Sequence, residues 1–382
     1  MRRIGIARSC GTALLLLLAV GARAWSYDSY PMVQGFVPDA RGGGMGRAFT
    51  AVAEGPSAIW WNPGGLGLVR GWWVAPLSVA PSSSPFADVK FRAYGICGPV
   101  GRGGWAAHYG RLTLHDSSTL DETESALAIG YGLDLAEVLH GEPDPRFRWG
   151  VGGSVKRLAI HTPNTVNPAW EDLSAWDVDL GTLVRLERTL ARLPVLPIIT
   201  TSPQPRASFV AGRSGVALAN ALDRKIGPND SPLGREIRMG LGVESGLIAT
   251  PPFDHLLRTL ATLEVEHSFT RKELGNNVKF GVEATLLGIV TWRYGEFDDH
   301  YRFQTGSGQE MRVESRNARG VTQGVGVRLG GERASVSFDY ARTRRGTVDA
   351  KLYTVSAHWV PRPSRDRGIS FDEKGLIKRR FL

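Results

Sequence analysis

Apolar and polar residues alternate with a period of two along most of this chain. From Ile237 to Val243 every second side chain is apolar, and the residues between them are arginine or glycine. The same alternation returns in residues 277–286 and again in residues 320–329. Because successive side chains of a β-strand point to opposite faces, this period predicts strands that each have one apolar face.

Fourteen segments of this kind follow one another, most of them nine to fourteen residues long. A tilted strand needs about 9–11 residues to cross a bilayer, and a single-chain bacterial barrel has an even number of strands. The pattern therefore predicts an all-β fold, a transmembrane antiparallel β-barrel of about 14 strands. The predicted strands are residues 71–80, 88–98, 103–114, 122–133, 146–160, 176–186, 206–219, 235–245, 256–269, 277–286, 288–297, 320–329, 334–343 and 351–360.

The same pattern has a second interpretation, a soluble all-β protein whose apolar faces point inward. Aromatic residues such as Trp72 and Trp359 lie near segment ends, where a membrane barrel carries its aromatic girdles. The connections over residues 161–175 and 297–319 are long and polar, as extracellular loops are, whereas residues 187–205 form a long connection on the opposite side. We favour the barrel, and the soluble sandwich remains the alternative.

The chain begins with the features of a cleaved secretory signal peptide, predicted over residues 1–24. Arginines precede an apolar run of leucines, and Ala22-Arg23-Ala24 forms a small-x-small cleavage site. Cleavage lowers the formal net charge from +9 to +5, because four arginines leave with the peptide, so a nucleic-acid partner is not expected. It also leaves Cys97 as the single cysteine, so no internal disulfide is expected.

In a membrane barrel the polar face of each strand lines the lumen, and here that face carries charges of both signs. Asp177 and Asp179 share a face, as do Glu264 and Glu266, and paired carboxylates suit a divalent metal or acid–base chemistry. No histidine or cysteine stands at ligand spacing near either pair, so we favour ion pairs with lysine and arginine of neighbouring strands. The candidate lumen charges are Lys156, Asp177, Asp179, Arg238, Glu264, Glu266, Lys279, Glu283, Arg293 and Arg328, together with Glu244 and Asp339.

The sequence contains no serine-elbow, zinc-protease or Walker signature. The glycine run at residues 42–46 resembles a dinucleotide loop, but it has neither a regular strand before it nor a long helix after it. The single histidines His108 and His267 lie within predicted strands and are interpreted as structural. We therefore expect no catalytic residue, no metal site and no cofactor.

Residues 40–69 carry a compound motif: a glycine-rich start, Met-Gly-x-Ala, a run of small residues, and an aromatic pair before Asn-Pro. The motif is similar to the N-terminal signature of outer-membrane barrels related to the long-chain fatty-acid transporter (FadL-like barrels). Within that group it resembles the PorV/PorQ-type branch more closely, with softer matches over residues 40–360. The motif residues are Gly44, Met45, Gly46, Ala48, Trp60, Trp61, Asn62, Pro63, Gly64 and Leu66.

The resemblance implies an N-terminal hatch over residues 25–70 that folds into the lumen of a barrel over residues 71–360. The glycines of residues 42–46 would let the hatch backbone approach the barrel wall closely. Two features depart from the family. Gly64 stands where the family has alanine, and a basic tail over residues 361–382, expected in the periplasm, replaces an aromatic C-terminus.

The resemblance also implies a location in the cell outer membrane and a function. The first hypothesis is a passive channel for hydrophobic or amphipathic small molecules, gated by the hatch. The second is a PorV-like interaction component of a secretion or surface-attachment system of the type IX kind. The expected partners are accordingly outer-membrane lipid and a hydrophobic small molecule, or exported and secretion-system proteins. A third hypothesis, an outer-membrane hydrolase, lacks a candidate nucleophile.

Overall fold

The computed structural model describes most of the chain between residues 37 and 361. The predicted signal peptide, the first part of the predicted hatch and most of the predicted tail lie outside the described residues. No described helix is long and apolar enough to cross a bilayer. The described ranges are residues 37–83, 88–115, 121–144, 146–163, 172–192, 205–227, 231–249, 255–270, 276–305, 312–331, 333–345, 348–361, 370–371 and 377–378.

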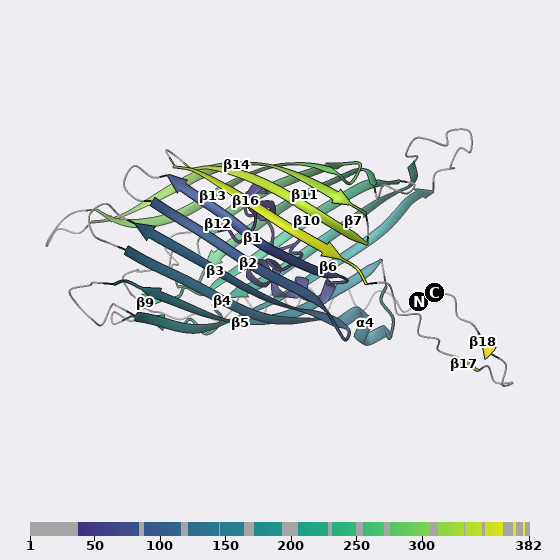
Figure 1. Cartoon of the computed structure of the whole chain (residues 1–382), viewed down its shortest axis with the longest axis horizontal. Helices are drawn as coiled ribbons and strands as arrows, with labels where there is room; N and C mark the ends of the chain where they lie inside the picture. Colours follow the sequence, from purple (N-terminus) through teal and green to yellow (C-terminus); the bar gives the residue numbers. More distant parts are fainter. Residues whose placement is uncertain are drawn as a thin grey trace.

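Fourteen antiparallel strands form a closed barrel (Figure 1). Each barrel strand pairs with the next one along the chain, and the first pairs with the last to close the sheet. The strand number and the closure confirm the predicted fold class. The barrel strands are β1 (Trp72–Ser83), β2 (Asp88–Val100), β3 (Gly103–His115), β4 (Asp121–Asp134), β5 (Phe147–His161), β6 (Asp172–Arg192), β7 (Pro205–Ala219), β10 (Glu236–Ala249), β11 (His255–Ser268), β12 (Asn276–Leu286), β13 (Val290–Thr305), β14 (Arg312–Gly330), β15 (Ala334–Arg345) and β16 (Val348–Trp359).

The outer face of the barrel is apolar. On β10 the side chains of Leu241 and Val243 are 62% and 59% exposed, whereas Glu244 next to them is 2% exposed. Apolar side chains that face outward from a closed sheet are typical of a barrel in a bilayer, where every backbone group is paired and lipid covers the apolar face. A soluble sandwich would bury these residues, so the soluble interpretation is wrong.

The two ends of the barrel carry different connections. At the end where β1 begins and β16 ends, here called the near end, helix α4 (Leu135–His140) joins β4 to β5 (Figure 1). At the opposite end, the far end, the short hairpin of β8 (Lys225–Ile226) and β9 (Ser231–Pro232) lies between β7 and β10. The alternation of polar and apolar residues predicted neither α4 nor this hairpin, because α4 is a helix of six residues and each strand of the hairpin has only two.

Some predicted connections are shorter in the structure than in the sequence prediction. The predicted loop over residues 297–319 is mostly strand, because β13 and β14 stay paired as far as Thr305 and Arg312. Main-chain hydrogen bonds do not depend on side-chain polarity, so the ladder continues after the apolar pattern ends. For the same reason β6 extends into both of the other long connections.

Residues 37–70, here called the hatch segment, lie inside the barrel (Figure 1). Asp39 caps the first helix of the segment, since its carboxylate accepts the N–H of Gly42 at 2.7 Å. Asn62 ends the second helix and caps the following turn, where its side-chain oxygen accepts the N–H of Gly64 at 3.0 Å. The three helical pieces are α2 (Ala40–Gly44), α3 (Ala58–Trp61) and the 3₁₀ helix η2 (Pro63–Leu68).

Glycines let the hatch segment touch the barrel wall with its backbone. A Cβ atom on Gly295 of β13 would overlap the backbone nitrogen of Gly46, and one on Gly150 of β5 would overlap the carbonyl oxygen of Gly64. Gly46 has φ +62°, which glycine adopts without strain. The segment is therefore packed backbone against backbone on two sides of the lumen.

We expect Gly295→Ala to weaken the docking of the hatch segment, because the new methyl group would overlap the backbone of Gly46. Overpacking of this kind costs about 1–3 kcal/mol. The segment should become accessible to added protease while the barrel keeps its heat-modifiable migration on gels. Gly212→Ala is the matched control, since a Cβ atom there meets nothing within 4 Å. Equal protease resistance in both variants would contradict the proposed backbone contact.

Candidate functional site

Buried hydrogen bonds from the barrel wall hold the hatch segment in the lumen. Glu264 of β11 accepts the backbone N–H groups of Phe49 and Thr50 at 2.9 and 2.8 Å. Thr322 of β14 accepts the N–H of Gly46 at 2.9 Å. Unpaired backbone groups are costly in a buried place, so these wall side chains make the position of the segment specific.

Asn62 joins the hatch segment to itself and to the wall. Its side-chain nitrogen donates to the carbonyl oxygen of Thr50 at 2.9 Å and to that of Thr182 on β6 at 2.8 Å. Its side-chain oxygen accepts from Gly64, and the residue is fully buried. Asn62 therefore uses both ends of its amide group, which explains why an asparagine stands at this turn.

A chain of ion pairs crosses the lumen through the hatch segment. Glu283 of β12 binds Arg41 of the segment and Arg293 of β13, each at 2.8 Å. Arg293 also binds Asp339 of β15 at 2.6 Å. Arg41 continues the chain to Glu54 of the segment at 3.0 Å. Buried charges are tolerated only when they are paired, and here the wall supplies the partners.

Glu54 connects the chain of ion pairs to another part of the barrel wall. Arg213 of β7 binds Glu54 at 2.9 Å and also binds Glu244 of β10. Burial raises the pKa of the Glu54 carboxyl, but Arg41 and Arg213 outweigh burial and hold that pKa well below its usual range. The carboxyl therefore stays ionised near neutral pH, and the hatch segment is fixed by charge on two sides of the lumen.

The twelve candidate lumen charges all lie on the inner face of the barrel. Most of them form ion pairs between strands; Lys156 of β5, for example, binds Asp179 of β6 at 2.7 Å. Asp177 differs, because its carboxylate accepts the backbone N–H groups of Leu222 and Arg224 at 3.0 Å each. Asp177 therefore fixes the start of the β7–β10 connection, a role that the expected ion pair did not include.

That connection folds back into the far end of the lumen. Its residues Ile226 and Leu233 are buried against an apolar sector of the inner wall, formed by Phe91 of β2, Leu112 of β3 and Leu158 of β5. The sequence analysis missed this sector, because alternation predicts that the charged face of a strand lines the lumen, whereas Arg92, Arg111 and Arg157 of these strands are exposed on the outer face. The available signal was the scarcity of charged residues at alternate positions of β2 and β3.

Two cavities lie in the lumen on opposite sides of the hatch segment. The far cavity has a volume of about 60 Å³ and reaches Ala219 at the end of β7. The near cavity has a volume of about 290 Å³, reaches the turn at Gly288 and includes Arg328 in its lining. Pro38 and His108 line both cavities, so these two residues lie where the cavities meet.

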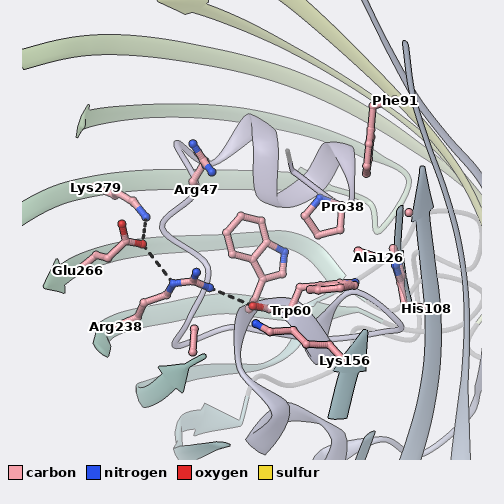
Figure 2. A pocket seen from close by; sticks show the side chains of 13 residues that line it. Pro38, Arg47, Trp60, Phe91, His108, Ala126, Lys156, Arg238, Glu266 and Lys279 are labelled. Atoms are coloured by element: carbon pink, nitrogen blue, oxygen red, sulfur yellow. Dashed lines mark hydrogen bonds and ion pairs between the residues drawn. The ribbon is translucent and has the colours of Figure 1, made fainter. Parts of the chain in front are cut away.

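The far cavity has an aromatic side and a charged side (Figure 2). Trp60 and Phe91 contribute rings to its lining. Glu266 accepts from Lys279 at 2.7 Å and from Arg238 at 3.1 Å, and Arg238 donates to the carbonyl oxygen of Trp60 at 3.0 Å. This arrangement suits a molecule that has both an apolar and a polar part. Among the described residues, no group of three or more His, Cys, Asp or Glu is arranged for a metal ion.

Barrels of known structure resemble this one at low sequence identity, whereas no sequence family and no curated protein matches the chain. A FadL homologue of Pseudomonas aeruginosa is 10% identical, with TM-score 0.43 over 84% of this chain and 98% of that chain. The CymD monoaromatic hydrocarbon channel is 10% identical, with TM-score 0.42 over 86% and 98%. The toluene transporter TodX of Pseudomonas putida is 9% identical, with TM-score 0.38 over 85% and 98%. At these scores the function must be argued from the residues of this chain, and the PorV/PorQ resemblance stays a prediction.

We expect Glu283→Ala to lower the free energy of unfolding by about 3 kcal/mol, because it removes the carboxylate that Arg41 and Arg293 share in a buried place. Glu296→Ala is the matched control. Its carboxylate binds Arg319, and its side chain is 35% exposed against 4% for Glu283. An exposed pair contributes about 0–1 kcal/mol. Urea unfolding in detergent, followed by tryptophan fluorescence, measures the free energy of unfolding of both variants. An equal decrease in the two variants would contradict a stabilising role for the lumen network.

Proposed function

We propose that this protein is a passive outer-membrane channel for hydrophobic or amphipathic small molecules, closed in this state by the hatch segment. The observation that carries the proposal is a lumen with a cavity on each side of a segment that hydrogen bonds and ion pairs hold against the barrel wall. Hydrogen bonds and ion pairs break and re-form without any chemical step. The hatch segment is therefore suited to act as a gate.

The near end faces the periplasm in this proposal, and the far end faces the outside. Short turns, at residues 101–102 and 287–289, join strands at the near end, as periplasmic turns do in bacterial barrels. The predicted signal peptide agrees with export from the cytoplasm. A solute that enters from outside would therefore meet the far cavity first and the near cavity second.

The lining of the lumen favours an amphipathic solute over a purely apolar one. One sector of the wall is apolar, whereas the hatch segment and the strands from β10 to β15 contribute ion pairs. A molecule without polar atoms would have to displace water from these charges and offer them no partner, which is costly. The carboxylates Glu264 and Asp177 bind backbone N–H groups, a structural role that supports transport over hydrolysis.

Uptake by intact cells tests the channel. The full chain is produced in a Gram-negative strain that lacks its own long-chain fatty-acid transporter, and uptake of radiolabelled oleate and of a labelled aromatic acid is compared with an empty vector. Uptake above the vector supports the proposal. No uptake by a folded barrel, together with co-purification of exported proteins, would favour the interaction role that the PorV/PorQ resemblance implies.

Asn62→Ala should increase the uptake rate, because it removes the hydrogen bond that holds the hatch segment to Thr182 of the barrel wall. One hydrogen bond of about 0.5–1.5 kcal/mol shifts a closed–open equilibrium by roughly two- to tenfold. Asn276→Ala is the matched control, since its side-chain oxygen bonds His267 in an exposed part of the barrel. If both variants transport at the wild-type rate, the hatch segment is not the gate.

A further inference from the structure

His108 lies at the meeting point of the two cavities. It projects from the inner face of β3 and lines both cavities, as does Pro38 of the hatch segment. Its strand partner Gly95 leaves room for the imidazole: a Cβ atom on Gly95 would lie 2.7 Å from Cδ2 of His108 and 2.7 Å from Cβ of Pro56. The imidazole therefore fills the space between the wall and the hatch segment.

Two nitrogen atoms at this point are buried and have no hydrogen-bond partner among the described residues. They are Nδ1 of His108, a residue that is 4% exposed, and Nε1 of Trp60. The two rings meet edge to face, with 5.8 Å between centroids and 83° between planes. Buried polar atoms are nearly always hydrogen-bonded to protein or water, so each exception calls for a partner. These two nitrogens are thus available to a molecule that occupies the cavity.

We propose that the two cavities are parts of one path through the barrel, and that His108 interrupts this path where it contacts the hatch segment. The inference rests on the proposed channel function and adds to it the residue that closes the path and the solutes that it admits. The hatch segment forms one side of the contact, and His108 forms the other. Movement of either side joins the cavities.

The cavity volumes show why this contact must open. An apolar cavity of about 150 Å³ holds one benzene molecule. The far cavity, at about 60 Å³, is smaller than that, whereas the near cavity, at about 290 Å³, is larger. A solute with a six-membered ring therefore does not fit in the far cavity while His108 keeps its position. Passage requires the imidazole, or the Trp60 ring that it touches, to move aside.

The atoms around the contact select a planar organic anion. The indole N–H of Trp60 only donates, so its partner must be an acceptor such as a carboxylate or sulfonate oxygen. The flat face of the same indole offers a surface for a planar apolar body. The cationic side chains Lys156, Arg238 and Lys279 line the far cavity, whereas their partners Asp179, Glu236 and Glu264 lie outside its lining. A saturated hydrocarbon would leave both nitrogens without a partner.

Efflux from proteoliposomes tests the path. The purified full chain is reconstituted in vesicles loaded with radiolabelled benzenesulfonate, a planar anion that crosses lipid very slowly by itself. His108→Ala should raise efflux about tenfold over wild type, because the aromatic contact with Trp60 no longer has to be broken. His108→Phe keeps a ring at this place, so its efflux should stay at or below the wild-type rate. His267→Ala makes the same change at a residue that lines neither cavity.

Binding of the same probe tests the acceptor site. Trp60→Phe keeps an aromatic ring and removes the N–H group. Benzenesulfonate reaches this N–H group when the contact between His108 and Trp60 opens. The affinity of the detergent-solubilised protein for benzenesulfonate, measured by calorimetry, should fall about tenfold, as expected for the loss of one hydrogen bond to a charged group. The affinity for toluene should not change. Wild-type affinity of Trp60→Phe for benzenesulfonate would overturn the acceptor site.

The outcomes separate this inference from the channel function. If Asn62→Ala raises efflux and His108→Ala does not, the channel function stands and the path does not pass His108. If wild type and both variants release no probe, although heat-modifiable migration shows folded barrels, then the channel function itself fails. If His267→Ala raises efflux over wild type as much as His108→Ala does, the barrel is loosened in general. This result would also overturn the inference.

Discussion

A closed barrel of fourteen strands encloses more space than its inward side chains fill. Eight strands leave an interior that side chains fill, whereas sixteen or more leave an aqueous channel. This chain fills its lumen with its own residues 37–70, and the other features of the interior follow from that. Glycines stand where two backbones meet, carboxylates and hydroxyls stand where the segment presents N–H groups, and arginines stand where it presents charge.

The interior that results is asymmetric. At Phe91, Leu112 and Leu158 the inner wall is apolar and packs against the far-end connection, whereas from β10 to β15 it is a network of charges. The hatch segment lies between the two sectors and carries side chains of both kinds. Trp61 is buried in an apolar cluster, and Arg41 belongs to the ion-pair network. The cavities lie where the side chains of the hatch segment do not fill the space beside the wall. Both apolar and charged residues therefore line them.

The strands could be predicted from the sequence because each face of a membrane strand is uniform, as Leu241 and Glu244 illustrate. The roles of single inner residues could not. Asp177 binds backbone groups of a connection, and no side-chain pattern reports where a backbone N–H lies. His108 was interpreted as structural, since nothing in the sequence places it against Pro38. Alternation assigns a residue to a face, whereas a site depends on what lies opposite, which only the closed barrel determines.

The contacts of the hatch segment also determine the order in which the molecule assembles. Ala40 donates to Thr354, 314 residues further along the chain, and Gly46 donates to Thr322. The segment therefore precedes its partners along the chain by up to 314 residues and finds them only when the last strands are in place. Pairing of β1 with β16 then encloses it. Closure of the sheet and docking of the segment are thus one late, long-range step, and slow folding is expected of contacts so distant in sequence.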